Sequence, residues 1–505
     1  MHKIKNIITI FGLKFLILLF INQLILKGLL YYGIFNNLIF PLFSYLGIST
    51  STIQIYSTFM YLPWTLKPIT GLIVDTTIIL FYKKIFWQWF SCLIGICSTL
   101  IFFTNNYNII LLIFSFVLLN SFIAILDLIC ESKYSEIMRL NPESGSSIIM
   151  YNSLCQQIGA FMGMIIIGPL MDNNNYFVIF LIIGISTFIS IYPNVANWIN
   201  ENKNNEIFGL NEIIFRNKGL IILPIYLGLC SLAYFWISYC PYLILQLCFF
   251  VVMFLLFIAL TYFYLDKTIA NVITYIILVN VLWLNFDYQL QYFYTNSDVI
   301  NGYDLNYTFY VTICNLVFFV SSITATIVYQ KMWGNITFRK KLLVIQILNV
   351  LPFTVDIILL TFTSTFINYI YVVKLLLILK QIIKCTTAFY SISLTTLYSK
   401  LCDKKIETIM ISLFAGVFNL SIMFSTWLSD QYYNVYLQYI GNEQTFKNFN
   451  LIIILLGIIL PIITVILTIK LVPKDKYEYD NLLETKCDDI MNNKNNEIKI
   501  EIEMG

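Results

Sequence analysis

The feature that most constrains this chain is a repeated pattern of long apolar runs separated by short polar stretches. A helix needs roughly 20 apolar residues to cross the hydrocarbon core of a bilayer, and the sequence holds about fourteen such runs. They lie near 15–40, 52–74, 85–104, 107–130, 148–171, 175–198, 219–240, 242–265, 267–295, 304–330, 341–363, 367–399, 407–433 and 448–472. We therefore expect an all-α polytopic membrane protein of about fourteen spans, with about twelve as the alternative.

The composition excludes several classes of protein. Of the 505 residues, 59% are hydrophobic and only 11% are charged, whereas a soluble domain is about 25% charged. The formal net charge of +3 is far from the strongly basic balance of a polymer-binding protein. A water-soluble enzyme, a nucleic-acid binder and a disordered scaffold are therefore not expected, and the lipid bilayer is the expected surrounding.

Basic residues fall in alternate loops, which predicts the orientation of the chain because cytosolic loops are enriched in Lys and Arg. The loops on the side of the N-terminus hold Lys3, Lys5, Lys14, Lys83, Lys84, Lys133, Arg139, Lys203, Arg216, Lys218, Lys267, Lys331, Arg339, Lys340, Lys341, Lys400, Lys404 and Lys405. The loops on the other side hold only Lys447. Both termini are therefore expected in the cytosol. No internal targeting signal is evident, which favours the plasma membrane.

The order of the spans predicts two homologous six-helix bundles with a helical hairpin between them. The expected units are an N-terminal bundle (1–199), a cytosolic linker (200–218), an inserted two-helix hairpin (219–266), a C-terminal bundle (267–473) and a cytosolic tail (474–505). This is the arrangement expected of a major-facilitator transporter with two added helices. In such a protein the solute site lies between the bundles near the middle of the membrane.

Residue types that carry catalysis or bind metals are scarce. The only histidine is His2, at the N-terminus. The sequence contains no glycine-rich phosphate loop ending in Lys-Ser or Lys-Thr, and no Cys/His cluster with the spacing of a zinc site. We therefore expect neither an enzyme nor a bound cofactor or metal.

A first motif lies around the second predicted span. Its residues are two prolines that interrupt the helix, a glycine and an aspartate one turn apart, and two lysines in the next loop: Pro63, Pro68, Gly71, Asp75, Lys83 and Lys84. The glycine allows close approach of another helix. The aspartate can accept a hydrogen bond from a facing helix N-terminus or bind a basic residue, which would lock the bundles in one state. The alternative is a loop with orienting lysines and a structural aspartate.

A second motif lies on the fourth predicted span. Asp127 and Glu131 are four residues apart and therefore share one face of the helix, and Glu136 and Arg139 follow at its cytosolic end. An acid at membrane depth costs about 2.5–3.5 kcal/mol on insertion scales. Two such acids need a partner, a proton or an aqueous cavity. The alternative is a structural ion-pair network.

Several lysines also fall within predicted spans. Lys374 and Lys384 are most simply explained by side chains that reach back to the membrane surface. Lys27 in the first span and Lys380 in the twelfth are harder to explain in this way. We therefore expect Lys27 and Lys380 to belong to a functional site.

These motifs resemble those of the folate–biopterin transporter family. The first is W-x-x-K-P-x-x-G-x-x-x-D with paired basic residues after it, and the second is the acidic series on span four. A late element adds a Cys, a Glu-Thr pair and a deeper Asn. The matching residues are Trp64, Lys67, Pro68, Gly71, Asp75, Lys83, Lys84, Asp127, Glu131, Glu136, Arg139, Cys402, Glu407, Thr408 and Asn419. The Asn-, Ile-, Lys- and Tyr-rich composition further resembles that of apicomplexan folate transporters.

The resemblance implies a proton-coupled importer of folates or related pterins that works by alternating access, with p-aminobenzoate as a further candidate substrate. It implies that Asp127 and Glu131 bind the ring edge or carry the proton, because burial disfavours a charged carboxylate. Lys27 and Lys380 would bind the tail carboxylates. Residues implied to form the conformational motif are Lys67, Pro68, Gly71, Asp75, Lys83, Lys84, Glu136, Arg139, Glu407 and Asn419. The alternatives left open are a major-facilitator transporter of another small organic solute and a non-transporting membrane paralogue.

Overall fold

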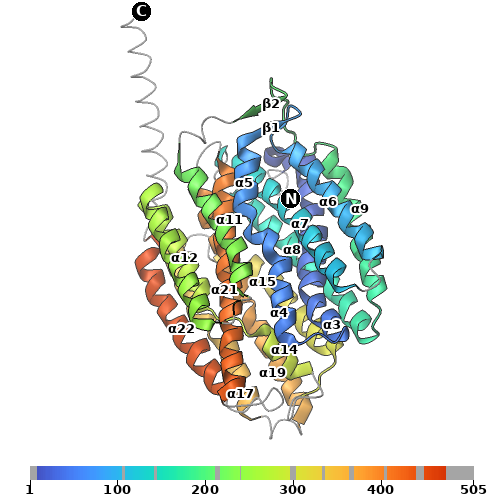
Figure 1. The fold of residues 1–505 in the computed structure, drawn as a ribbon, viewed down its shortest axis with the longest axis vertical. Helices are drawn as coiled ribbons and strands as arrows, with labels where there is room; N and C mark the ends of the chain where they lie inside the picture. Colours follow the sequence, from blue (N-terminus) through green and yellow to red (C-terminus); the bar gives the residue numbers. More distant parts are fainter. Residues whose placement is uncertain are drawn as a thin grey trace, which may run out of the picture.

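A computed structural model describes residues 8–104, 108–140, 145–210, 217–238, 240, 242–295, 303–332, 336–362, 369–402, 406–439 and 449–473. Within these ranges the protein is a bundle of helices that run roughly along one direction (Figure 1). The helices before the linker are α2 (Leu13–Ile21), η1 (Asn22–Phe35), α3 (Asn36–Tyr45), α4 (Thr50–Thr65), α5 (Lys67–Thr76), α6 (Ile85–Thr104), α7 (Ile109–Leu140), α8 (Gly145–Asp172) and α9 (Tyr176–Val195).

The remaining helices form the hairpin and the C-terminal half. The hairpin consists of α11 (Gly219–Ser238) and α12 (Leu243–Tyr264). After it come α13 (Lys267–Leu282), α14 (Asp287–Thr295), η3 (Thr308–Ile313), α15 (Cys314–Met332), α16 (Phe338–Leu348), α17 (Leu351–Thr361), α19 (Ile370–Lys384), α20 (Thr386–Leu401), α21 (Glu407–Tyr439) and α22 (Phe449–Leu471).

The predicted all-α polytopic class is confirmed. In the described part of the chain, 10 helices are long and apolar enough to cross a membrane. Two further predicted spans contain the shorter apolar helices Lys267–Leu282 and Ile459–Leu471. The predicted spans 52–74 and 367–399 are each divided into two helices by a turn, at Leu66 and at Cys385. The total number of spans and the boundaries between the five predicted units stay predictions.

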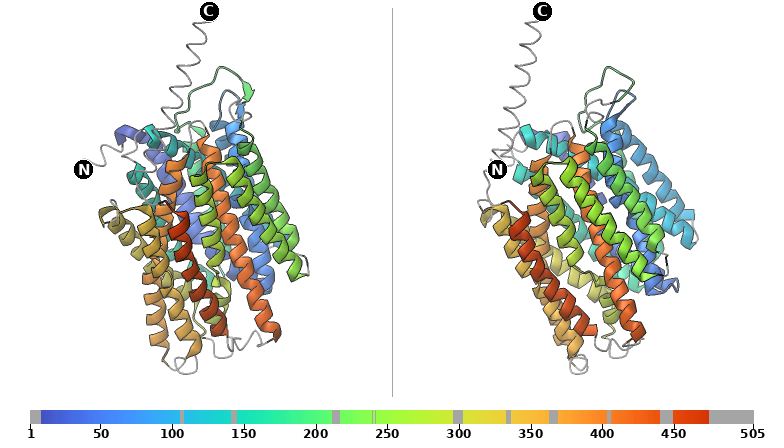
Figure 2. Two further views of the ribbon diagram at one scale, coloured as in Figure 1. Left: turned by 90° about the vertical axis from the view of Figure 1, so that its left-hand side faces the viewer. Right: turned by 60° about the vertical axis from the view of Figure 1, so that its left-hand side comes forward.

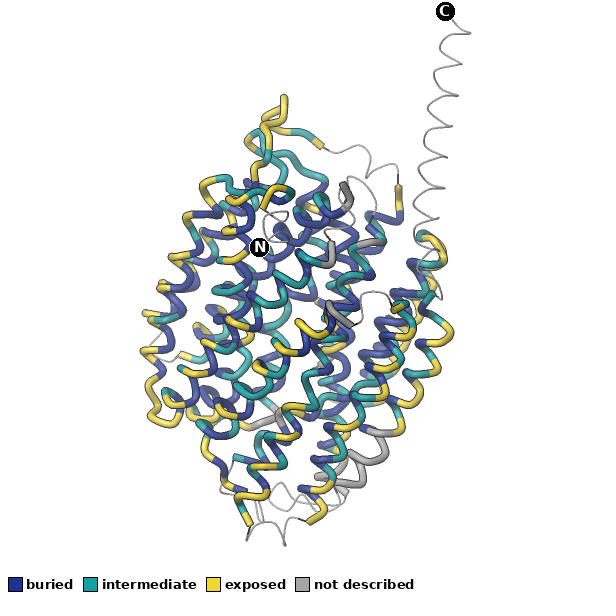
Figure 3. The backbone as a smooth tube through the Cα atoms, turned by 180° about the vertical axis from the view of Figure 1, so that it is seen from behind, coloured by how far each residue is buried: buried dark blue, intermediate teal, exposed yellow. Residues whose placement is uncertain are grey.

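The outer surface is apolar, as expected for a protein surrounded by lipid. Large apolar side chains are strongly exposed on the outer helices, for example Ile110 at 77% and Phe263 at 79%. Figure 3 shows the exposed positions along the outside of the bundle and the buried ones along its middle. A contiguous apolar surface of this extent is typical of a membrane protein.

Small residues bring η1 and α8 into close contact. Gly28 and Gly33 of η1 face Gly159 and Gly163 of α8 so closely that an added Cβ would meet backbone atoms of the other helix. Because these glycines have no side chains, the two helix backbones can pack directly against each other, which is the usual basis of tight helix pairing in membranes. Over these residues η1 has the wider turns of a π-helix, a geometry often found at functional sites.

The N- and C-terminal halves contact each other along two seams. One seam joins α4 and α5 to α21, and the other joins α8 to η3 and α15. At the top of Figure 1, β1 (Thr77–Ile79) pairs antiparallel with β2 (Phe208–Leu210). This small sheet attaches the loop after α5 to the segment that precedes the hairpin, at the end of the bundle predicted to be cytosolic.

The hairpin lies on the outside of the bundle beside the first seam, and Figure 2 shows α11 and α12 next to α21. Ile69 of α5 packs where a Cβ on Gly228 of α11 would lie. On the other side of the seam, the Tyr234 hydroxyl of α11 donates to the backbone oxygen of Met423 in α21 at 3.0 Å. The hairpin therefore contacts helices of both halves.

Candidate functional site

Four charged side chains meet inside the bundle and are called the charged cluster: Lys27 from η1, Lys67 from the start of α5, and Asp127 and Glu131 from α7. All four residues are buried, with exposed fractions of 9% or less. The spacing that places both acids on one face of α7 therefore brings them to lysines from two other helices. Lys67, which the sequence assigned only to the conformational motif, is a member of this cluster.

The two acids of the cluster are paired to different extents. The Asp127 carboxylate lies 2.8 Å from Lys27 Nζ and 2.6 Å from Lys67 Nζ, and it accepts a further hydrogen bond of 3.0 Å from Gln23 Nε2. Glu131 lies farther from the same amines, at 3.4 Å and 3.6 Å. Its Oε2 is buried and accepts no hydrogen bond from the residues that the structure describes. Asp127 therefore holds the two lysines together, while Glu131 keeps an unused acceptor.

The helix is interrupted at Leu66, between α4 and α5, and this interruption positions Lys67 at the start of α5. The prediction that both prolines interrupt this span is wrong for Pro63, which lies inside α4. Pro68 has no N–H and so cannot donate to the Trp64 carbonyl one turn earlier. That carbonyl instead accepts a 3.0 Å hydrogen bond from Asn419 Nδ2 of α21. Pro68 and Asn419 thus act together at the seam between the halves.

We predict that Asn419→Ala destabilises the protein by about 1–3 kcal/mol, because it leaves the Trp64 carbonyl without a donor. Pro68→Ala supplies a backbone N–H one turn away, so the double variant should recover part of this loss. Thermal unfolding of the purified single and double variants measures both effects. Equal melting temperatures for Asn419→Ala and the wild type would show that the hydrogen bond contributes nothing.

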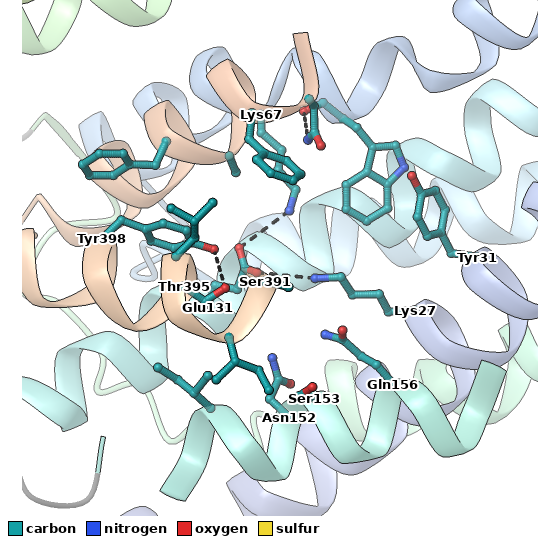
Figure 4. A pocket seen from close by; sticks show the side chains of 18 of the residues that line it. Lys27, Tyr31, Lys67, Glu131, Asn152, Ser153, Gln156, Ser391, Thr395 and Tyr398 are labelled. Atoms are coloured by element: carbon teal, nitrogen blue, oxygen red, sulfur yellow. Dashed lines mark hydrogen bonds and ion pairs between the residues drawn. The ribbon is translucent and has the colours of Figure 1, made fainter. Parts of the chain in front are cut away.

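The charged cluster borders a cavity of about 130 Å³ between the two halves, drawn in Figure 4. Figure 4 shows Lys27 and Lys67 directed toward the Glu131 carboxylate from two sides. The C-terminal half contributes residues of α20 and α21, among them Tyr398 and Asn419. Asp127 does not line this cavity, because the two lysines and Gln23 surround its carboxylate.

The same cavity adjoins a larger one of about 480 Å³. Both are lined by Tyr31, Tyr32, Trp64, Phe418 and Asn419, so an aromatic wall is common to them. The ring centroids of Tyr31 and Trp64 are 4.5 Å apart. The larger cavity extends to α14 and α19, and together the two form an elongated space between the halves.

Lys380, predicted to lie with the other three site residues, lines the larger cavity instead of the smaller one. Its Nζ lies 2.7 Å from Asp356 Oδ1, and both residues are buried. The Tyr294 hydroxyl donates to the same carboxylate oxygen at 3.1 Å. The structure therefore brings together Lys27, Asp127 and Glu131, and it places Lys380 in a separate ion pair at the other end of the elongated space.

The remaining motif residues lie at the end of the bundle that carries β1 and β2. The Asp75 carboxylate accepts a 3.0 Å hydrogen bond from the N–H of Ile409 in the first turn of α21, and Lys83 Nζ lies 3.3 Å from it. Next to this contact, a Cβ on Gly71 would overlap Ser412 of α21. α5 and α21 are therefore joined across the first seam by backbone contact and by one carboxylate.

Three further motif residues have separate surroundings. Lys84 Nζ lies 3.2 Å from Glu136. Glu407 is the first residue of α21, where a negative charge interacts favourably with the helix dipole. The side chain of Arg139 lies outside the described residues.

The contacts between the halves at the opposite end of the bundle were not expected from the sequence. There the Asp172 carboxylate at the end of α8 accepts from the N–H groups of Tyr307 and Thr308, each at 3.1 Å, and from the Thr308 hydroxyl. Asp430 of α21 accepts from Gln289 and Asn434 side chains. Asp172 is the last residue of the glycine-rich helix α8, and an acid at the end of a predicted span could have indicated a contact there. The two halves thus contact each other at both ends of the elongated space.

Comparison with known proteins identifies both a family and a fold. A sequence model of the BT1 family matches residues 33–487. The structure is similar to that of an auto-inhibited POT family peptide transporter, with a TM-score of 0.63, 11% identity, and coverage of 92% of this chain and 98% of that chain. It is also similar to the POT family transporter PepTSo, with a TM-score of 0.64, 12% identity, and coverage of 90% and 98%.

A third similar structure is a bacterial homologue of the iron transporter ferroportin in an outward-facing state. It has a TM-score of 0.54 and 11% identity, and the coverage is 90% of this chain and 98% of that chain. These likenesses confirm the predicted major-facilitator type of fold. No curated protein matches the sequence, and the resemblance to apicomplexan transporters stays an expectation.

Proposed function

The chain belongs to the BT1 family, and we propose that it is a secondary transporter of folates or related pterins that imports them with protons by alternating access. The family includes folate–biopterin transporters. The observation that carries the proposal is Glu131, whose carboxylate borders the cavity between the halves beside the aromatic wall and is paired with the lysines at longer distances than Asp127. A pterin ring offers the matching groups, because its amide-amidine edge donates to a carboxylate and its flat faces pack on aromatic rings.

The arrangement of the charged cluster divides the roles expected of the two acids. Asp127 is held between two ammonium groups and serves to position Lys27 and Lys67. Glu131 is more loosely paired and faces the cavity, so it is the residue that binds the ring edge or takes up the proton. Its Oε2 borders the cavity without a hydrogen bond from the described residues, so a ligand N–H or a proton can bind there.

The contacts at both ends of the elongated space support alternating access. Asp75 and Gly71 join the halves at the β1–β2 end, and Asp172 joins them at the other end. Rocking of one half against the other would break one set of contacts while it keeps the other. The cavity between the halves would then open to one side of the membrane at a time.

The proposal is tested by uptake of labelled folic acid into a folate-auxotrophic microbe that produces this chain. Unlabelled folic acid, 5-formyl-tetrahydrofolate, biopterin and p-aminobenzoate are added as competitors, and external pH is varied. We expect uptake that pterins inhibit, that is faster at acidic pH and that an uncoupler abolishes. If labelled folic acid is not taken up, or if none of the four compounds reduces its uptake, the proposed substrate class is wrong. A transporter of another small organic solute would then be the better description.

We predict that Glu131→Gln removes the acceleration of uptake at acidic external pH and lowers the maximal rate at least about tenfold, since amide and carboxylate differ in charge at the cavity. The uptake profile between acidic and neutral pH measures this. Asp304→Asn is the matched control, because Asp304 is exposed and does not line the described cavities. A pH profile of Glu131→Gln that parallels the wild type would remove Glu131 from proton coupling.

A further inference from the structure

The elongated space has a second polar end that the proposed function leaves unused. Beyond the aromatic wall, the larger cavity is lined by Asn285, Asp287, Gln291, Gln381 and Lys384. These residues come from α14, α19 and the segment that precedes α14. The ends of the space thus differ, with a compact, buried charged cluster at one end and amide side chains with a looser ion pair at the other.

The two lysines at this second end are not equivalent. Lys380 is buried and lies 2.7 Å from Asp356, which neutralises it. Lys384 Nζ lies 3.6 Å from Asp287 Oδ1, beyond hydrogen-bond distance, and the two side chains are 37% and 63% exposed. Lys384 can therefore exchange the Asp287 carboxylate for another anion at little loss, whereas Lys380 would have to leave a buried partner.

The surrounding groups suit a carboxylate ligand. The amides of Asn285, Gln291 and Gln381 each carry an NH₂ group that can donate to an anionic oxygen, and Lys384 supplies the positive charge. A charge-assisted hydrogen bond from an ammonium group to a carboxylate is roughly twice as strong as a neutral one. Asp287 is the group with which such a ligand would compete.

We infer that Lys384, with the neighbouring amide side chains, forms a carboxylate subsite that binds the acidic tail of an elongated substrate whose ring lies at Glu131. The inference rests on the proposed function and specifies its substrate class, pterins that carry an aminobenzoyl-glutamate tail. It assigns the tail to Lys384 and leaves Lys380 a structural partner of Asp356. The lysine that simple hydropathy assigns to the membrane surface thus becomes the one that selects the substrate.

The test compares two labelled substrates that share the ring and differ in the tail, folic acid and biopterin. Lys384→Gln should raise the KM for folic acid about tenfold or more and leave the KM for biopterin unchanged. Asp287→Asn should lower the KM for folic acid, because it removes the competing carboxylate. If the Lys384–Asp287 pair were only structural, both variants would impair both substrates alike.

The matched control is Lys374→Gln on the same helix. Lys374 Nζ lies 5.1 Å from the centre of the Phe309 ring and does not line the described cavities. Its removal should change neither KM. A parallel change in the two KM values with Lys384→Gln, or no change in either, would overturn the subsite.

Binding of the tail alone separates this inference from the proposed function. Purified wild-type protein should be stabilised against thermal unfolding by p-aminobenzoyl-glutamate, and Lys384→Gln should lose this shift. A shift that persists in Lys384→Gln would overturn the subsite. Transport of both substrates with unchanged KM values in Lys384→Gln overturns the subsite alone, whereas wild-type protein that binds neither folic acid nor biopterin overturns the proposed function as well.

Discussion

Gly159→Ala should abolish the folded protein or lower its stability by about 3 kcal/mol or more, the upper part of the range for overpacking a core. A Cβ at this position would overlap the carbonyl oxygen of Leu24 and lie 2.9 Å from the N atom of Leu29. Both are backbone atoms of η1, which cannot turn aside as a side chain can. Because η1 carries Lys27, separation of η1 from α8 would also displace the charged cluster. The amount of folded protein after purification, followed by thermal unfolding, measures the effect.

The control is the same substitution at Gly184 of α9. There an added Cβ would lie 3.2 Å from the ring of Phe103, whose side chain is 44% exposed and free to shift by a few tenths of an ångström. Gly184→Ala should therefore leave the yield and melting temperature close to those of the wild type. Comparable losses in the two variants would show that glycine itself, and not the η1–α8 contact, determines the outcome.

Asp127→Asn should be the most damaging change of a charged residue, with a loss of about 3–5 kcal/mol, because it leaves two buried ammonium groups to share one carboxylate. Lys27 and Lys67 lie 2.8 Å and 2.6 Å from Asp127, and among the described residues only Glu131 remains to pair with them. Folate uptake should fall together with the amount of folded protein. Thermal unfolding and the quantity of protein at the membrane report the two effects.

A second substitution tests the charge balance directly. Asp127→Asn combined with Lys67→Gln removes one charge of each sign, so the double variant should regain much of the lost stability. Asp304→Asn is the matched control, because Asp304 is exposed and its φ of 45° suits asparagine. A double variant less stable than Asp127→Asn alone would show that charge balance does not control this site.

The fold class was largely predictable because hydropathy is a local property of the sequence, so each long apolar run indicates a membrane-spanning helix by itself. Each described helix overlaps an expected span or directly follows one. The break at Leu66 was placed less well, since a proline changes a helix differently at its start and in its middle. Pro63 is tolerated inside α4, whereas Pro68 is the second residue of α5.

The site was predictable only in part because its partners come from distant segments. The spacing of Asp127 and Glu131 revealed one face of one helix, but the lysines that neutralise them lie 60 and 100 residues away from Asp127. The sequence assigned Lys67 to the conformational motif, and nothing in that motif indicated that Lys67 also pairs with Asp127. Lys380 was grouped with Lys27 because both are embedded, and only the position of Asp356 shows that Lys380 is already neutralised.

The position of the α11–α12 hairpin constrains how the two halves can move. Ile69 fits against Gly228 on the N-terminal side of the first seam, and Tyr234 is bonded to Met423 on the C-terminal side. Any tilt of α5 away from α21 must therefore shear one of these attachments. The inserted hairpin is therefore attached to both halves, and these two attachments limit how far the halves can tilt apart. We expect removal of the hairpin to change the range of this motion.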